Sequence, residues 1–96
     1  MYKQLTIICN NQIAKTVEQT LSRAGIQGFA HMQGTGTNVF TKSAFSQDLT
    51  WPADIFIVPT EEDLVKDIVD RLKQYAGQCR EEPCLKLIVS PVEEFY

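Results

Sequence analysis

Two cysteines near the C-terminus have a spacing that indicates redox chemistry. Cys79 and Cys84 are separated by four residues in a polar segment. This spacing permits a small disulfide if the two Cα atoms approach to within about 7 Å. In a reducing compartment such a bond would act as a redox switch rather than as a structural link. Two incidental thiols are the alternative, and a zinc site would need two further ligands.

A pair of glycines indicates a second kind of chemistry. Gly34-Thr35-Gly36-Thr37 follows a predicted strand, and paired glycines let backbone N–H groups approach an anion closely. The third glycine of a dinucleotide-binding motif is missing, because Val39 stands at that position, and the Gly-Lys-Ser/Thr of a P-loop is absent. The segment is therefore either an anion-binding turn or a plain turn.

The remaining polar residues do not form a catalytic group. His31 is the only histidine, and it is either a metal ligand shared between subunits or an ordinary sheet histidine. Acidic residues at Glu61, Glu62 and Asp63 are explained by the positive end of a helix dipole. No Ser-His-Asp or Cys-His arrangement is present. We therefore predict no catalytic residue and no metal site, and we do not expect an enzyme.

Length and charge restrict the possible classes of protein. The 96-residue chain has a net charge of −3 and no cluster of lysine or arginine, so nucleic-acid binding is not expected. Apolar runs are only a few residues long, so no membrane insertion is expected. No leader segment is evident, which makes the cytoplasm the expected location. The length favours a single domain, residues 1–96.

Helical and strand periodicity predicts four strands and two helices in the order β-α-β-β-α-β. This order is typical of the ferredoxin-like α+β fold, a four-stranded antiparallel sheet with two helices on one face. We expect Asn10 or Asn11 to cap the first helix, Gly25 to end it and Thr60 to cap the second. The predicted strands are residues 3–9, 26–33, 54–58 and 85–90, with a long loop at residues 34–52.

Apolar residues point to both faces of the predicted sheet. Two helices on one face would leave the other face exposed, and exposed apolar patches usually mark an interface. We expect Ile8, Phe56, Val58 and Ile88 on that exposed face, with Phe29 beside them. The chain is therefore predicted to form an oligomer, sheet against sheet. The alternative is that the C-terminal tail or the long loop covers this face.

The predicted loop is long for so small a domain. Connections of 19 residues are usually functional or disordered, and this one contains Val39, Phe40, Phe45, Leu49 and Trp51. These side chains are too apolar for a fully solvated loop. We expect them to contact a neighbouring subunit or a partner protein.

Three stretches of the chain resemble PII-like signalling proteins: residues 25–36 (GIQGFAHMQGTG), 53–58 (ADIFIV) and 85–94 (LKLIVSPVEE). The resemblance implies a ferredoxin-like homotrimer. It identifies residues 34–52 as the T-loop, which contacts a regulated transporter, enzyme or transcription factor in that family. It also implies that a small anionic effector, commonly an adenine nucleotide such as ATP, ADP, AMP or a cyclic nucleotide, binds between subunits.

The resemblance implies a set of effector-binding residues. Gly34 and Gly36 match the glycines at the T-loop base, and Lys86 matches a lysine that meets nucleotide phosphates. The hydroxyls of Thr35 and Thr37 are further candidate donors. The chain departs from the family pattern at residues 78–84 (QCREEPC), where glutamates replace a glycine-rich phosphate turn and would repel phosphate.

Other departures and alternatives remain. Thr37 replaces an expected basic residue, and the T-loop has no tyrosine, so uridylylation of the usual kind is not expected. One alternative is a small-molecule sensor resembling ACT domains, which share the order of elements and usually dimerise. Another is a metal- or redox-responsive module that uses Cys79 and Cys84. Acylphosphatases share the architecture, but their arginine-bearing loop is replaced by residues 9–12 (CNNQ).

Overall fold

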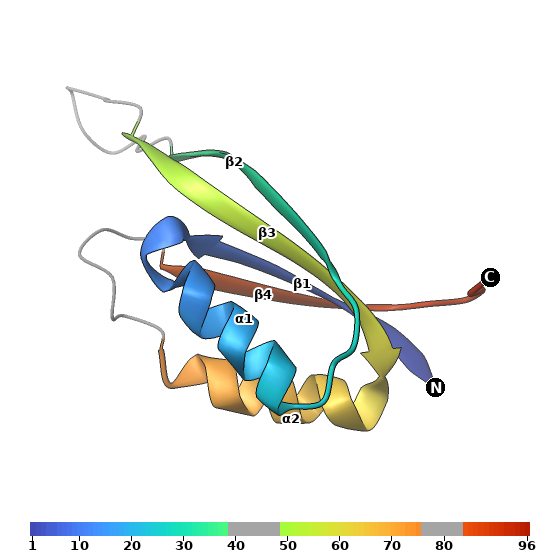
Figure 1. Cartoon of the computed structure of the whole chain (residues 1–96). Helices are drawn as coiled ribbons and strands as arrows, with labels where there is room; N and C mark the ends of the chain where they lie inside the picture. The colour runs from blue at the N-terminus through green and yellow to red at the C-terminus, as the bar shows by residue number, and fades with distance from the viewer. Residues whose placement is uncertain (39–48, 76–83) are drawn as a thin grey trace.

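The computed structural model describes residues 1–38, 49–75 and 84–96 (Figure 1). In this part of the chain the strands form one antiparallel sheet in the order β2-β3-β1-β4. This α+β arrangement is compatible with the predicted ferredoxin-like fold. The elements are β1 (Tyr2–Asn10), a 3-10 turn (Asn11–Ile13), α1 (Ala14–Arg23), β2 (Ala30–Asn38), β3 (Leu49–Glu61), α2 (Glu62–Lys73) and β4 (Leu85–Pro91).

The two ends of α1 follow the predicted signals. The side chain of Asn10 accepts a hydrogen bond from the Gln12 backbone N–H at 3.1 Å, which satisfies a donor at the start of the helical segment. Gly25 has φ +87°, the left-handed conformation that ends helices. Ile26 then donates its N–H to the carbonyl of Leu21 at 3.1 Å. Ile26 therefore belongs to the helix end, and β2 begins four residues later than predicted.

The start of α2 differs from the prediction. Thr60 is paired with Lys3 inside the β1–β3 ladder, so it is a strand residue and does not cap the helix. The capping position is taken by Glu61, whose side chain makes no capping hydrogen bond. Instead, the carbonyl of Met1 accepts from the Glu62 N–H at 3.1 Å, and the N-terminal ammonium pairs with Glu61 at 3.3 Å. Because the β1–β3 ladder extends to Glu61, α2 begins only at Glu62.

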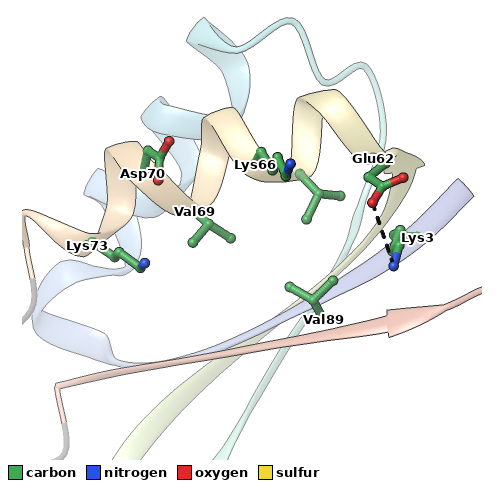
Figure 2. Close-up of a pocket in the computed structure, with 8 residues that line it drawn as sticks. Lys3, Glu62, Lys66, Val69, Asp70, Lys73 and Val89 are labelled. Carbon is green, nitrogen blue, oxygen red and sulfur yellow. Dashed lines mark ion pairs between the residues drawn. The ribbon is translucent and has the colours of Figure 1, made fainter. Parts of the chain in front are cut away.

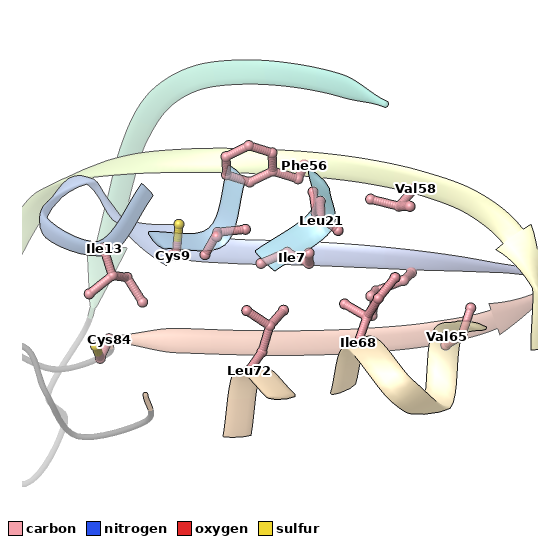
Figure 3. Close-up of a cluster of buried hydrophobic side chains, with 12 residues drawn as sticks. Ile7, Cys9, Ile13, Leu21, Phe56, Val58, Val65, Ile68, Leu72 and Cys84 are labelled. Atoms are coloured by element: carbon pink, nitrogen blue, oxygen red, sulfur yellow. The ribbon is translucent and has the colours of Figure 1, made fainter. Parts of the chain in front are cut away.

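Both helices pack on the same face of the sheet (Figure 1). The side chains between the two layers form one cluster, shown in Figure 3, and most of its members have no exposed surface. Burial of each such side chain contributes about 1.5–3 kcal/mol. The cluster contains Leu5, Ile7, Cys9, Ile13, Val17, Leu21, Phe56, Val58, Val65, Ile68, Leu72 and Cys84.

One predicted face assignment is wrong. Phe56 and Val58 are fully buried beneath the helices rather than exposed on the other face. The reason is the register, because Phe56 pairs with Ile7 and Val58 pairs with Leu5, and paired residues share a face. Phe29 also lies on the helix side, with its ring centroid 5.6 Å from that of Phe56.

The predicted loop is shorter than expected at both ends. Residues 34–38 and 49–52 are paired strand residues, with Gly34 opposite Ala53 and Thr37 opposite Thr50. The two glycines therefore belong to a long β2–β3 ribbon and not to a turn. The apolar residues at 39, 40 and 45 lie outside the described residues. No helix in the described part of the chain is long and apolar enough to cross a membrane.

Candidate effector-binding face

The sheet face opposite the helices is apolar and accessible. We call it the open face and define it by Ile8, Met32, Ile55, Ile57 and Ile88, which alternate along their strands with the buried core residues. The exposed fraction is 51% for Ile88 and 45% for Met32. Ile8 and Ile88 were predicted here, whereas Ile55 and Ile57 replace Phe56 and Val58.

The C-terminal tail does not cover the open face. It continues in line with β4, away from the sheet centre (Figure 1). The Val92 N–H donates to the Tyr2 carbonyl at 3.4 Å, and the Phe95 ring lies 5.0 Å from that of Tyr2. These contacts are at one end of the sheet and leave Ile88 half exposed. The tail was one of two segments expected to cover the open face, and its position excludes it. The other segment, the long loop, falls partly on residues 39–48, outside the described residues.

Gly36 lies beneath the indole of Trp51. The two residues are opposite each other in the β2–β3 ladder. A Cβ atom at Gly36 would lie 2.1 Å from Cε2 and 2.6 Å from Nε1 of the indole, so only glycine permits this packing. A Cβ atom at Gly34, in contrast, would meet nothing within 4 Å. The two predicted glycines therefore have different roles.

Trp51 carries an unused hydrogen-bond donor. Its side chain is buried, with 7% of the residue exposed, and its Nε1–H has no partner among the described residues. Buried indole N–H groups usually find an acceptor. Sequence reasoning noted Trp51 only as an apolar loop residue. The sequence carried no signal of its position on Gly36, because that position follows from the β2–β3 register.

Lys86 stands at the far edge of the open face. It is exposed and lies opposite Ile8 in the β1–β4 ladder. Three strand spacings separate β4 from β2, or about 14 Å. Lys86 is the only lysine or arginine in the described strands whose position faces this side. One chain therefore does not bring Lys86 and the glycines together.

The two threonines point to the opposite side. Thr35 is paired with Pro52 and Thr37 with Thr50, and these positions alternate with Gly36 and Trp51. The predicted effector-binding residues are therefore divided between faces. Gly34, Gly36 and Lys86 share the open face, whereas Thr35 and Thr37 belong to the helix side and cannot join them within one subunit.

A charged cluster on the helix side was missed by sequence reasoning. Nε2 of His31 lies 2.7 Å from Oδ1 of Asp54, and Nδ1 lies 3.2 Å from Oε1 of Glu18. The Asp54 side chain is only 3% exposed, and the imidazole stacks on Phe56 with centroids 4.2 Å apart. His31 is thus a paired sheet histidine, as the simpler of its two readings expected. The feature of the sequence that could have revealed this cluster is Asp54, a charged residue at the start of an apolar predicted strand. A buried charge requires a partner, so a residue that pairs with Asp54 could have been expected.

The cysteines have separate environments. Cys9 is free and fully buried. Burial, and secondly the charge of Asp54, raise the pKa of its thiol to about 12, so it is unreactive at neutral pH. Cys84 lies in the core cluster with 5% exposed, whereas Cys79 lies outside the described residues. In the part of the chain that is described, no three His, Cys, Asp or Glu side chains are placed to hold a metal ion.

No family model matches the chain, and no curated protein matches it.

Proposed function

We propose that this chain is a PII-like regulatory subunit that assembles through its open face and binds a small anionic effector between subunits. An apolar face with half-exposed Ile88 and Met32 supports the assembly, because monomeric proteins rarely leave such a patch uncovered. Three copies, as in the family that the sequence resembles, would bring their open faces together around one axis.

The main support for an effector site between subunits is that its expected residues lie at two opposite edges of the sheet. Gly34 and Gly36 lie on β2 and Lys86 lies on β4, at opposite edges of the same face. An anion bound by one chain would reach only one half. Contact between the β4 edge of one subunit and the β2 edge of the next would place both halves around one cleft.

Each half would contribute a different interaction. Lys86 provides a positive charge for phosphate or carboxylate oxygens. The ribbon provides a backbone without a side chain at Gly34, where a ligand can approach closely. An adenine nucleotide, with a polyanion and several acceptors, matches this combination.

Effector occupancy would be transmitted through residues 34–52. Because Trp51 and Gly36 belong to the arms of this segment, a ligand at their level would favour one conformation of the ribbon. A partner protein, such as a transporter, an enzyme or a transcription factor, would bind that conformation. The role is regulatory and requires no catalytic residue.

Isothermal titration calorimetry tests the effector site. ATP, ADP, AMP and cyclic AMP are titrated into the wild type and into Lys86→Ala, with Lys15→Ala as the control because Lys15 is an exposed residue of α1. We expect one effector per subunit, at least tenfold weaker binding for Lys86→Ala and unchanged binding for the control. Equal binding by wild type and Lys86→Ala would refute the role of Lys86. Binding of none of the four by either protein would contradict nucleotide sensing.

A further inference from the structure

A pocket of about 250 Å³ lies between α2 and β4, on the helix side of the sheet. Figure 2 shows Val69 of α2 and Val89 of β4 on its two walls. Lys86 and Gly34, which the proposed effector cleft uses, belong to the opposite face. The pocket is therefore a separate candidate site, independent of that cleft.

The pocket exists because α2 does not cover β4 completely. The buried stripe of α2, which consists of Val65, Ile68 and Leu72, packs into the core cluster. Val89 pairs with Leu5, so the two residues share the helix side of the sheet. Leu5 has no exposed surface there, whereas Val89 is 46% exposed. An apolar floor on the outermost strand is thus left open to solvent.

An ion pair closes one end of the pocket. Nζ of Lys3, on β1, lies 3.8 Å from Oε1 of Glu62, at the start of α2 (Figure 2). The two side chains are 27% and 46% exposed. Their charges offset each other, so this end of the pocket offers no net charge to a ligand.

The other charges of the rim come from later turns of α2. Lys66 and Lys73 carry ammonium groups, and Asp70 carries a carboxylate. None of these three side chains makes an ion pair within residues 1–38, 49–75 and 84–96. The surplus on the rim is therefore one positive charge. Charge complementarity then favours a ligand with a single negative charge over a polyphosphate.

Helical spacing places both free lysines beside the apolar wall. Val69 follows Lys66 by three residues and precedes Lys73 by four, and residues with these spacings are neighbours on a helix surface. Asp70 is the next residue along the helix, so its side chain leaves the axis about 100° away from that of Val69. An anion above Val69 is thus within the reach of both ammonium groups.

The dimensions of the pocket select a small linear ligand. At about 30 Å³ for each water-sized group, the volume holds roughly eight such groups. The lining residues of α2 extend from Glu62 to Lys73, which is about 16 Å along the helix axis. A volume of 250 Å³ over this length is narrow, so an unbranched chain fits it better than a ring.

We propose that this pocket binds a medium-chain fatty acid. The carboxylate lies between the ammonium groups of Lys66 and Lys73 and supplies the single negative charge that the rim lacks. The hydrocarbon chain lies on Val65, Val69 and Val89 and removes the exposed apolar floor from water. A chain of roughly eight carbons matches the volume.

Titration of the full chain with sodium octanoate tests the proposal. Binding is measured by calorimetry, and its place by the backbone amide shifts of ¹⁵N-labelled protein. Acetate has only the head group and octan-1-ol only the chain, so each should bind at least tenfold more weakly. We expect one octanoate per chain, with the largest shifts in residues 62–73 and 87–91. Absence of octanoate binding, equal binding of octan-1-ol, or largest shifts elsewhere would overturn the proposal.

Two variants separate the charge of the rim from the apolar floor. Lys66→Gln with Lys73→Gln removes both ammonium groups from exposed positions and should weaken octanoate binding at least tenfold. Val89→Glu places a carboxylate on the floor and should abolish measurable binding. Lys15→Gln, on the exposed surface of α1, is the control and should bind as the wild type does. With unchanged circular dichroism spectra, wild-type affinity in either pocket variant would refute the site.

Discussion

His31 joins α1 to the centre of the sheet through two carboxylates. Its Nε2 atom lies 2.7 Å from Asp54 of β3, and its Nδ1 atom lies 3.2 Å from Glu18 of α1. The Asp54 carboxylate, only 3% exposed, thus has the imidazole as its hydrogen-bond partner, and the ring stacks on Phe56 with centroids 4.2 Å apart.

Removal of the imidazole should destabilise the fold. In His31→Ala the buried Asp54 carboxylate loses the partner that pairs with it in the structure, and we expect a loss of about 2 kcal/mol. A hydrogen bond to a charged group contributes about 1.5–3 kcal/mol, and the value expected here is in the lower half of that range because 28% of the His31 side chain is exposed. Urea unfolding followed by circular dichroism measures the change.

Two further variants test whether loss of the contact with Asp54 causes the destabilisation. Arg71→Ala removes an exposed ion pair with Asp67 and should cost about 0.5 kcal/mol or less. His31→Ala combined with Asp54→Asn should recover part of the lost stability, because a neutral amide replaces the unpaired charge. If the double variant were as unstable as the sum of the single changes, the pairing would not be the cause.

Cys9 should resist alkylation in the folded protein. Burial and the neighbouring Asp54 charge raise the pKa of its thiol to about 12, and only the thiolate reacts. At pH 8 we expect iodoacetamide to modify Cys9 at the rate of global unfolding, measured by mass spectrometry of the peptide that contains it. The same peptide in urea should react at least a hundredfold faster. Rapid modification of Cys9 without denaturant would contradict the buried position.

The raised pKa of Cys9 also predicts how the free energy of unfolding changes with pH. The ordinary pKa of a cysteine thiol is 9.0, so the unfolded chain ionises Cys9 above that pH while the folded chain keeps it protonated. Stability should therefore fall as the pH rises from about 9 to about 12. Cys9→Ala should remove this part of the decrease, which urea unfolding at pH 8 and pH 10 measures.

The order of elements was predictable because each helix shows a clear apolar stripe. Val17 and Leu21, and likewise Ile68 and Leu72, follow helical spacing and are buried as expected. The faces of β3 were not predictable in the same way. Residues 55–58 are all apolar, so alternation gives two equivalent solutions, and only the pairing with β1 decides between them.

The long-range contacts of the site were beyond sequence reasoning. Gly34 and Gly36 have low strand propensity, and nothing in residues 34–37 indicates that a tryptophan 15 positions later covers one of them. The pairing of His31 with Asp54 likewise spans 23 positions. Single residues could be singled out from the sequence, but the register that brings them together could not.

Substitution of the two glycines should separate their roles. Gly36→Ala places a Cβ atom within 2.6 Å of three atoms of the Trp51 indole, so the ring must move. We expect a loss of about 1–3 kcal/mol and a red shift of the emission of the single tryptophan. Gly34→Ala is the matched control, because its Cβ atom meets nothing within 4 Å. An identical spectrum for Gly36→Ala and the wild type would show that Trp51 does not lie on Gly36.

A charge on the open face should prevent the proposed assembly without unfolding the subunit. Ile88 is 51% exposed, so Ile88→Glu leaves the isolated subunit intact, whereas burial of its carboxylate between sheets would cost several kcal/mol. We expect the mass in solution to fall threefold by light scattering, with an unchanged circular dichroism spectrum. Lys15→Glu, on the exposed surface of α1, should leave the mass unchanged. If Ile88→Glu kept the mass of the wild type, the open face would not be the interface, and a cleft that joins Lys86 to Gly34 would have no basis.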